Sequence, residues 1–289
     1  MIPHRLPAIA LLLFASRVPG FAAGNPPAPD LGYKDTPIIP STEWHVHDSD
    51  RPRPPMVTPG ATFSQLAPPP ADAIVLFDGK DLSRWSDARG NPARWRVADG
   101  YFESTRGSGG VRTREKFANF QLHLEFATPA NVTGSSQGRG NSGVLINGIY
   151  EVQILDSYNN PTYADGQAAA LYGQQPPLVN ASRPPGEWQT YELVFESPRW
   201  DAAGTLVKKA AVTVIHNGLV VQHRTEFFGS TDGVGSVPHK ALGKYGAPHP
   251  PEVFIELQDH SNPVRYRNVW LRALNPPAPP AIPPPATAP

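Results

Sequence analysis

The sequence predicts an all-β protein built as a jelly-roll sandwich of two antiparallel sheets. Between about residues 72 and 274, short runs of alternating apolar and polar residues are separated by Gly, Pro, Asn and Asp turns. No segment keeps a helical apolar period over ten residues, which argues against a sheet wound with helices. Most of the 36 prolines lie outside this region, so the folded core is shorter than the 289-residue chain.

Four segments follow from this composition. In residues 1–23, basic residues precede a short apolar run and small residues follow it, which predicts a secretory signal peptide. Residues 24–71 form a Pro-rich arm, residues 72–274 form the β-sandwich domain, and residues 275–289 form a Pro-rich tail that we expect to be disordered. We therefore expect a periplasmic or secreted protein without a membrane anchor, and the absence of cysteine excludes disulfides and thiolate metal sites.

The predicted strands follow one another at short intervals. Residues 73–77 open the domain, an Asp-Gly turn joins a hairpin over residues 95–102, and residues 120–126 alternate strictly. Asn217-Gly218 joins two later strands and is the strongest short hairpin signal in the chain. The remaining predicted strands cover residues 144–146, 150–155, 188–195, 211–216, 219–223, 253–257 and 264–271.

The charge of the chain is balanced, with 25 basic and 25 acidic side chains. No global field attracts nucleic acid or an anionic membrane, so we expect neither as a partner. A neutral ligand such as a carbohydrate fits this balance.

The segment of residues 150–156, Tyr-Glu-Val-Gln-Ile-Leu-Asp, is the candidate active-site strand. Glu151 and Gln153 are two apart, so both project from one face at a separation of roughly 7 Å, which suits a sugar ring lying across them. We predict Glu151 as a general base and Gln153 as a sugar ligand. Asp156 could rejoin that face only through a bulge. The alternative is that Glu151 lies on an ordinary solvated strand face.

Polar side chains alternate on two other predicted strands. His123 and Glu125 share a face of residues 120–126, and they would extend the patch of Glu151 if the two strands were neighbours; otherwise that face is simply solvated. Glu256, Gln258 and His260 make a third row of this kind, and Arg265 and Arg267 follow within a few residues.

Several polar and aromatic side chains on loops and late strands are candidate sugar ligands. Arg267 could hold vicinal sugar oxygens or offset developing negative charge, or it could form an ion pair across the sheet. Asn141 and Ser142 could recognise hydroxyl groups or form a plain turn. Tyr158 and Tyr172 lie in a long loop and are candidates for stacking on a sugar ring.

The arm carries two histidines, His45 and His47, two residues apart. On an extended segment they would point the same way, as a metal pair or as part of a site wall; the alternative is a surface arm packed on the domain. No pair of candidate ligands has a specific metal spacing, so the sequence leaves a divalent metal ion as an open alternative.

Five motifs occur in one order along the chain: LFDGKDLSRW at 76–85, GRGNSGVLI at 138–146, YEVQILDS at 150–157, GEWQTYELVF at 186–195 and LQDHSNPVRYRNVWLR at 257–272. Together they resemble the 3-keto-disaccharide hydrolase family, which was first catalogued as a domain of unknown function. The resemblance covers about residues 71–274. It implies a concanavalin-like jelly roll and a 3-keto-glycoside as the substrate.

The chemistry implied by this resemblance is elimination followed by hydration. A ketone at C3 acidifies the C2 proton, so a base can form an enolate and the C1 substituent can leave. The candidate catalytic residues are Glu151, Glu125, His260 and Asp156. The candidate substrate-binding residues are Gln153, Asn141, Ser142, Gln258, Arg267 and His123.

Two alternatives stand beside this lyase and hydratase chemistry. One is a direct glycoside hydrolase, although Gln153 replaces the middle acid that a retaining double displacement on this strand would need. The other is a non-catalytic carbohydrate-binding jelly-roll module, because fold alone does not fix function. A binding module favours exposed aromatic residues, whereas this chain offers rows of acids, histidines and arginines, which favours catalysis.

Overall fold

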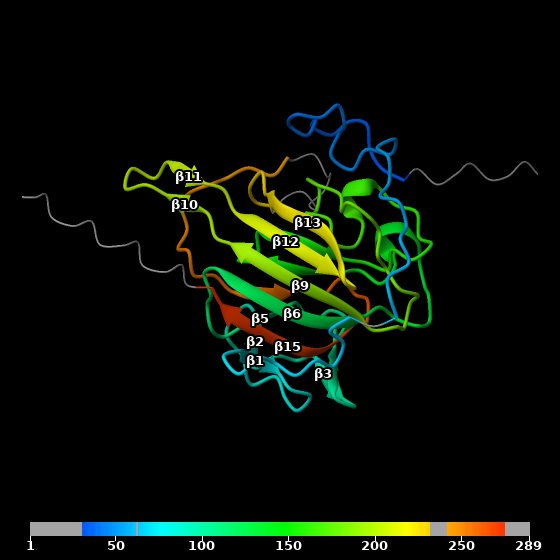
Figure 1. Cartoon of the computed structure of the whole chain (residues 1–289), viewed down its shortest axis with the longest axis vertical. Helices are drawn as coiled ribbons and strands as arrows, with labels where there is room; N and C mark the ends of the chain where they lie inside the picture. Colours follow the sequence, from blue (N-terminus) through cyan, green and yellow to red (C-terminus); the bar gives the residue numbers. More distant parts are fainter. Residues whose placement is uncertain (1–30, 62, 232–241, 275–289) are drawn as a thin grey trace, which may run out of the picture.

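The computed structural model describes residues 31–61, 63–231 and 242–274, and it is a sandwich of two antiparallel sheets (Figure 1). The two-sheet, all-β prediction is confirmed. The predicted signal peptide and C-terminal tail lie outside the described residues. Within the described ranges, no helix has both the length and the apolar character needed to cross a membrane.

The larger sheet has eight strands, in the order β13-β12-β9-β6-β15-β4-β3, and β1 also pairs with β15. Its two longest pairings join β6 to β9 and to β15. β15 is the last of the described strands, yet it lies between β6 and the strands at the start of the domain. The strands are β1 Ile74–Phe77, β3 Arg96–Ala98, β4 Tyr101–Glu103, β6 Phe120–Ala127, β9 Gln189–Glu196, β12 Ala211–His216, β13 Leu219–Glu226 and β15 Arg265–Ala273.

The smaller sheet has five strands, in the order β2-β5-β14-β7-β8. Its strands are β2 Trp85–Ser86, β5 Val111–Thr113, β7 Ser142–Ile146, β8 Tyr150–Ile154 and β14 Ile255–Leu257. A separate hairpin pairs β10 Arg199–Trp200 with β11 Leu206–Lys208, and two 3-10 turns cover Ser136–Gly138 and Ala164–Gly166. Strands β2, β5, β10 and β11 were not predicted, because two or three residues are too few to show alternation.

The core lies between the two sheets and is filled by alternate residues of each strand. On β6, Phe120, Leu122, Leu124 and Phe126 are all buried and point inward. Burying one such side chain contributes about 1.5–3 kcal/mol. The intervening residues of β6 therefore point away from the core, toward the outer face of the eight-stranded sheet.

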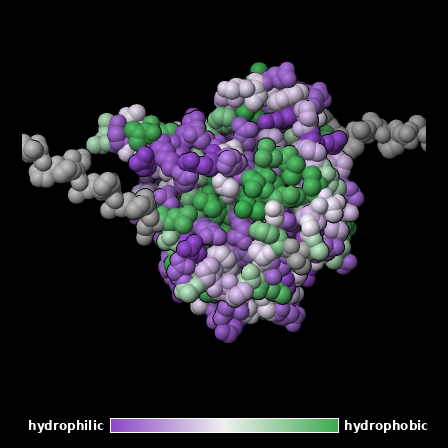
Figure 2. All heavy atoms as spheres, in the orientation of Figure 1, coloured by the Kyte–Doolittle hydropathy of each residue, from purple (hydrophilic) through white to green (hydrophobic). Residues whose placement is uncertain are grey.

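The N-terminal arm crosses the domain instead of extending away from it. Its residues 55–57 run beside Asn180, and residues 64–67 reach the outer face of the eight-stranded sheet, where the Leu66 N–H donates to Glu125. Figure 2 shows apolar atoms gathered near the middle of the face in view.

Candidate active site

Five side chains form one row across the outer face of the five-stranded sheet. The pairing register sets Arg112 opposite Glu256, Glu256 opposite Leu145, and Leu145 opposite Glu151. Beyond β8, the bridge between Val152 and Leu171 and the 3.3 Å bond from the Tyr172 N–H to the Glu151 carbonyl add Tyr172 to the row. Residues directly opposite in antiparallel strands point to the same face. This row, from Arg112 to Tyr172, is the candidate active site.

A second row lies beside the first. Gly143 is opposite Gln153, and the Gln258 N–H donates to the Gly143 carbonyl at 3.0 Å. The Gln153 amide donates to Gln137 Oε1 at 2.9 Å, which fixes its orientation. The row therefore sets two amide side chains on either side of a glycine, next to Glu151.

Glu151 is the most unusual group of the site. Its side chain is buried, and burial raises the pKa of its carboxyl group from 4.5 to about 8. Among the described residues it has no ion-pair partner and accepts no hydrogen bond. A carboxyl group held in this way is tuned to exchange a proton near neutral pH, as a general acid or base must.

Glycines make room for the two acids of the first row. A Cβ on Gly143 would lie 2.4 Å from Glu151 Oε1, and a Cβ on Gly110 would lie 2.6 Å from Glu256 Oε1. Both carboxyl groups therefore lie against backbone that any larger residue would cover. This close approach explains why glycine suits these two positions, one within β7 and one directly before β5.

Arg112 and Glu256 form the far end of the row. Burial raises the pKa of Glu256, and the charge of Arg112 only partly opposes this. The Arg112 guanidinium also lies 4.5 Å from the centre of the Phe254 ring. The site therefore combines two carboxyl groups of raised pKa with one cation.

Three buried polar atoms on this face have no hydrogen-bond partner among the described residues: Arg112 Nε, Gln153 Oε1 and Gln258 Oε1. An unpaired buried polar atom costs about 1–3 kcal/mol, so each needs an explanation. One donor and two acceptors on one face match the hydroxyl groups of a neutral sugar.

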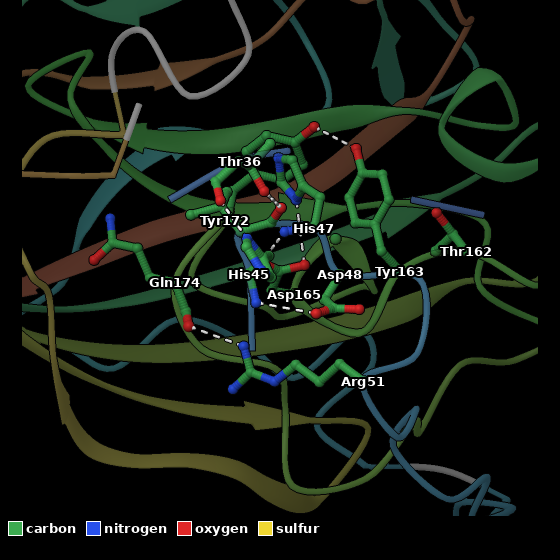
Figure 3. Close-up of polar contacts among 12 residues, drawn as sticks. Thr36, His45, His47, Asp48, Arg51, Thr162, Tyr163, Asp165, Tyr172 and Gln174 are labelled. Atoms are coloured by element: carbon green, nitrogen blue, oxygen red, sulfur yellow. Dashed lines mark hydrogen bonds and ion pairs between the residues drawn. The ribbon is translucent and has the colours of Figure 1, made fainter. Parts of the chain in front are cut away.

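The loop after β8 and the arm form the wall beside Tyr172 (Figure 3). Asp165 of the loop accepts hydrogen bonds from the His47 backbone N–H at 2.9 Å and pairs with His47 Nδ1 at 3.2 Å. The His47 ring lies next to Tyr163 and Tyr172, with ring centres 4.0 and 4.8 Å away. The arm is thus packed on the domain.

Asp156, Asn141 and Ser142 lie near the site but are engaged in other contacts. The β7–β8 register has no bulge, and Asp156 follows the end of β8, where it pairs with Arg139 at 2.6 Å. Asn141 donates to the Gln137 carbonyl at 2.7 Å. Ser142 points into the core, where its hydroxyl bonds the Gln258 carbonyl and the Tyr266 hydroxyl, both at 2.6 Å.

His123, Glu125 and Arg267 lie on the other sheet, so the structure separates them from Glu151. β6 and β8 belong to different sheets, and the outer faces of the two sheets point in opposite directions. Glu125 pairs with Arg267 at 2.7 Å, and His123 bonds Glu192 at 2.6 Å and stacks on Trp270. The ion-pair alternative for Arg267 is the arrangement present.

The other three histidines that the sequence analysis singled out, His45, His47 and His260, do not lie together. His260 is exposed on the loop after β14, beyond the row of Glu256 and Gln258. His45 Nδ1 bonds the Thr36 carbonyl, whereas His47 pairs with Asp165, so the two do not face a common point. Within residues 31–61, 63–231 and 242–274, no group of three or more His, Asp or Glu side chains could hold a metal ion.

Sequence reasoning missed Arg112, Gly143 and Asp165 as parts of this region. Arg112 belongs to a three-residue strand with no visible alternation. Gly143 carries no side chain, and Asp165 lies in a loop without periodicity. The sequence analysis did find two pairs of site residues, Glu151 with Gln153 and Glu256 with Gln258, because the members of each pair follow the two-residue period of a strand.

Comparisons with known proteins add three findings. The family model described as a 3-keto-alpha-glucoside-1,2-lyase-like domain matches residues 72–272. A relative from Bacteroides thetaiotaomicron, named 3-keto-disaccharide hydrolase, is 26% identical over 250 residues, which cover 71% of this chain and 81% of the relative. A crystal structure from Parabacteroides distasonis, provisionally described as a glycosyl hydrolase, is 44% identical with a TM-score of 0.65 and covers 77% of this chain and 93% of that chain.

Proposed function

The chain belongs to the 3-keto-alpha-glucoside-1,2-lyase-like family, and from this premise we propose that it is an exported enzyme that cleaves 3-keto-glycosides by elimination and hydration, with Glu151 as the base. The observation that carries the proposal is the buried Glu151 carboxyl, whose pKa of about 8 and lack of a partner among the described residues suit proton abstraction. The names of the Bacteroides and Parabacteroides relatives support a carbohydrate substrate.

The proposed reaction has two stages. Glu151 removes the C2 proton, the C–H electrons form an enolate with the negative charge on the C3 oxygen, and collapse of the enolate breaks the bond from C1 to the leaving oxygen. The leaving oxygen takes a proton, for which Glu256 is the candidate donor. Water then adds at C1 and a proton returns to C2. The net change equals hydrolysis of the glycosidic bond.

The rest of the face supports binding of the sugar. Arg112 supplies positive charge and a buried N–H, and the free amide oxygens of Gln153 and Gln258 can each accept a hydrogen bond from a hydroxyl. Leu145, half-buried between Glu256 and Glu151, offers an apolar floor for one face of the ring.

Direct hydrolysis is the second candidate. Glu256 and Glu151 both have raised pKa values, and they lie two strands apart in one row, so their backbones are about 10 Å apart. Inverting glycosidases hold their two carboxyl groups about 6.5–9.5 Å apart, with room for a water molecule. On that reading Glu151 would be the acid and the sugar would need no ketone.

The two candidates differ in what happens at C2. Purified protein is incubated in heavy water with a 3-keto-disaccharide or with its unoxidised parent, with and without EDTA. We expect the enzyme to cleave only the oxidised sugar, to place deuterium at C2, and to lose both activities on Glu151→Gln. Cleavage of the parent without deuterium at C2 would favour direct hydrolysis, and binding without turnover of either sugar would contradict both.

A further inference from the structure

Tyr172 lies opposite Glu151 in register, on the side of β8 away from Leu145. The Tyr172 N–H bonds the Glu151 carbonyl, and the neighbouring bridge joins Leu171 to Val152, so the two side chains leave adjacent strands on the same face. Adjacent strands are about 4.8 Å apart, which is close enough for two side chains to contact neighbouring atoms of one sugar ring.

The Tyr172 hydroxyl forms a hydrogen bond with the Tyr163 hydroxyl. The two hydroxyl oxygens are 2.7 Å apart, and Tyr163 is buried. When Tyr163 donates this hydrogen bond, Tyr172 keeps its own proton for a ligand. A hydrogen bond accepted by one hydroxyl strengthens the one it donates.

We infer that Tyr172 donates a hydrogen bond to the C3 oxygen of the bound 3-keto-sugar, and that the N-terminal arm holds it in place through His47. The inference rests on the proposed function. Glu151 takes the C2 proton, and the charge left on the C3 oxygen meets the Tyr172 hydroxyl next to it. No proton moves from Tyr172, which acts as an oxyanion donor.

The electrostatics of Tyr172 agree with this role. Burial raises the pKa of its phenol, the hydrogen bond with Tyr163 opposes this, and the charge of Glu151 raises the pKa again. Tyr172 therefore stays a neutral donor over the whole working range of pH, including the range in which Glu151 is ionised.

The N-terminal arm holds Tyr163 and Tyr172 in position. His47 comes 118 residues before Asp165 in the sequence, yet its backbone N–H and its ring both bond the buried Asp165 carboxylate. Its ring then packs against both Tyr163 and Tyr172, and the buried arm residues Ile39 and Val46 pack against Tyr172 as well. His47 is a positioning residue.

The test of Tyr172 is Tyr172→Phe, which removes one oxygen and keeps the ring. We expect C2 deuterium exchange and cleavage of the 3-keto-disaccharide to fall together, by about 100-fold or more, because both pass through the same enolate. Tyr101→Phe, on the eight-stranded sheet, is the matched control and should keep wild-type rates. Unfolding temperatures of both variants check that the fold is intact.

Three outcomes would contradict the inference. Cleavage that slows while exchange does not would assign Tyr172 to the leaving group instead. Exchange and cleavage that both stay at the wild-type rate would overturn the role of Tyr172 and leave the proposed function standing. A wild-type enzyme that places no deuterium at C2 would overturn the proposed function and this inference with it.

The positioning role of His47 needs a separate measurement. His47→Ala should lower kcat more than it raises KM, and adding it to Tyr172→Phe should cost little more, because the first change acts through the hydroxyl that the second removes. Losses that multiply in the double variant would show that His47 acts independently of Tyr172. His47→Phe keeps an aromatic ring against the tyrosines and should recover part of the lost kcat.

Discussion

Glu151 shows how much a single residue depends on the groups around it. The same carboxyl group on an exposed strand would be ionised at neutral pH, whereas here burial holds its pKa at about 8. The neighbouring acid Asp156 has an arginine partner, and Glu151 has none among the described residues. Isolation from positive charge is what separates a candidate base from a structural carboxylate.

The pH dependence of activity follows from this pKa. As a base, Glu151 must be ionised before it takes a proton, so the rate of C2 deuterium exchange on a 3-keto-disaccharide, which needs no proton from Glu256, should rise with pH and level off above about 8. A series of initial rates at low substrate between pH 5 and 9.5 measures this limb. A flat profile, or a limb that falls over the same range, would contradict the assignment of Glu151 as the base.

Stability should depend on pH in the opposite sense. Between pH 4.5 and about 8 the folded chain keeps the Glu151 proton that the unfolded chain releases, so the free energy of unfolding should fall as pH rises through this window. Glu151→Gln removes the titrating group. The variant should therefore be more stable than wild type at pH 8.5, by a few kcal/mol, and nearly equal to it at pH 4.5. Urea unfolding at both pH values compares the two proteins.

At the scale of elements, the strand period predicted which residues share a face but not which strands are neighbours. Glu151 with Gln153 and Glu256 with Gln258 were paired correctly because two residues apart on a strand means one face. His123 and Glu125 obey the same rule, yet β6 lies in the other sheet. Strand order depends on long-range packing, which a period of two residues does not encode.

Glu125 should act on stability. Although burial opposes it, hydrogen bonds from His123, Asn268, Leu66 and Arg267 lower the pKa of Glu125 to about 2. Glu125→Ala leaves Arg267 unpaired and should cost about 3 kcal/mol or more of unfolding free energy at pH 7, with little change in kcat/KM of the folded fraction. The contribution of ionised Glu125 to the unfolding free energy should be present above pH 4.5 and should be lost as pH falls toward 2.

The control for Glu125 is Glu115→Ala, which breaks an exposed ion pair with Arg84. An exposed pair contributes about 0–1 kcal/mol, so this variant should unfold almost as wild type does. Equal unfolding free energies for the two variants would contradict the structural role given to Glu125. A large loss of kcat/KM in folded Glu125→Ala would return it to the catalytic candidates.

Gly143 on β7 tests the geometry of the sheet itself. A methyl group at this position would meet Glu151 Oε1 at 2.4 Å, and the flexible carboxyl can move away more easily than the strand can. Gly143→Ala should therefore lower kcat at least tenfold while changing the unfolding temperature little, since a small misplacement of a catalytic group costs up to about 100-fold. The control is Gly138→Ala, because a Cβ at Gly138 meets no atom within 4 Å and the variant should keep full activity. Gly148→Ala is less suitable because the φ angle of Gly148 is positive.

For the whole molecule, the composition and turn pattern predicted the sandwich, but the path of the arm could not be predicted. Residues 31–61 have no strand or helix period, and their contacts are made one residue at a time with a loop that also lacks a period. The arrangement of His47 on Asp165 depends on packing between two such segments. Local sequence patterns do not encode such a contact, so the packing of His47 against Tyr163 and Tyr172 could not be predicted from the sequence.

The position of β15 in the eight-stranded sheet has a consequence for how the protein folds. The strand nearest the end of the domain pairs with β6 on one side and with β4 and β1 on the other, so it joins parts of the sheet that are made much earlier. The eight-stranded sheet cannot close until residues 265–273 have been synthesised. Such long-range pairing is slow to form, so we expect the eight-stranded sheet to be completed late in folding.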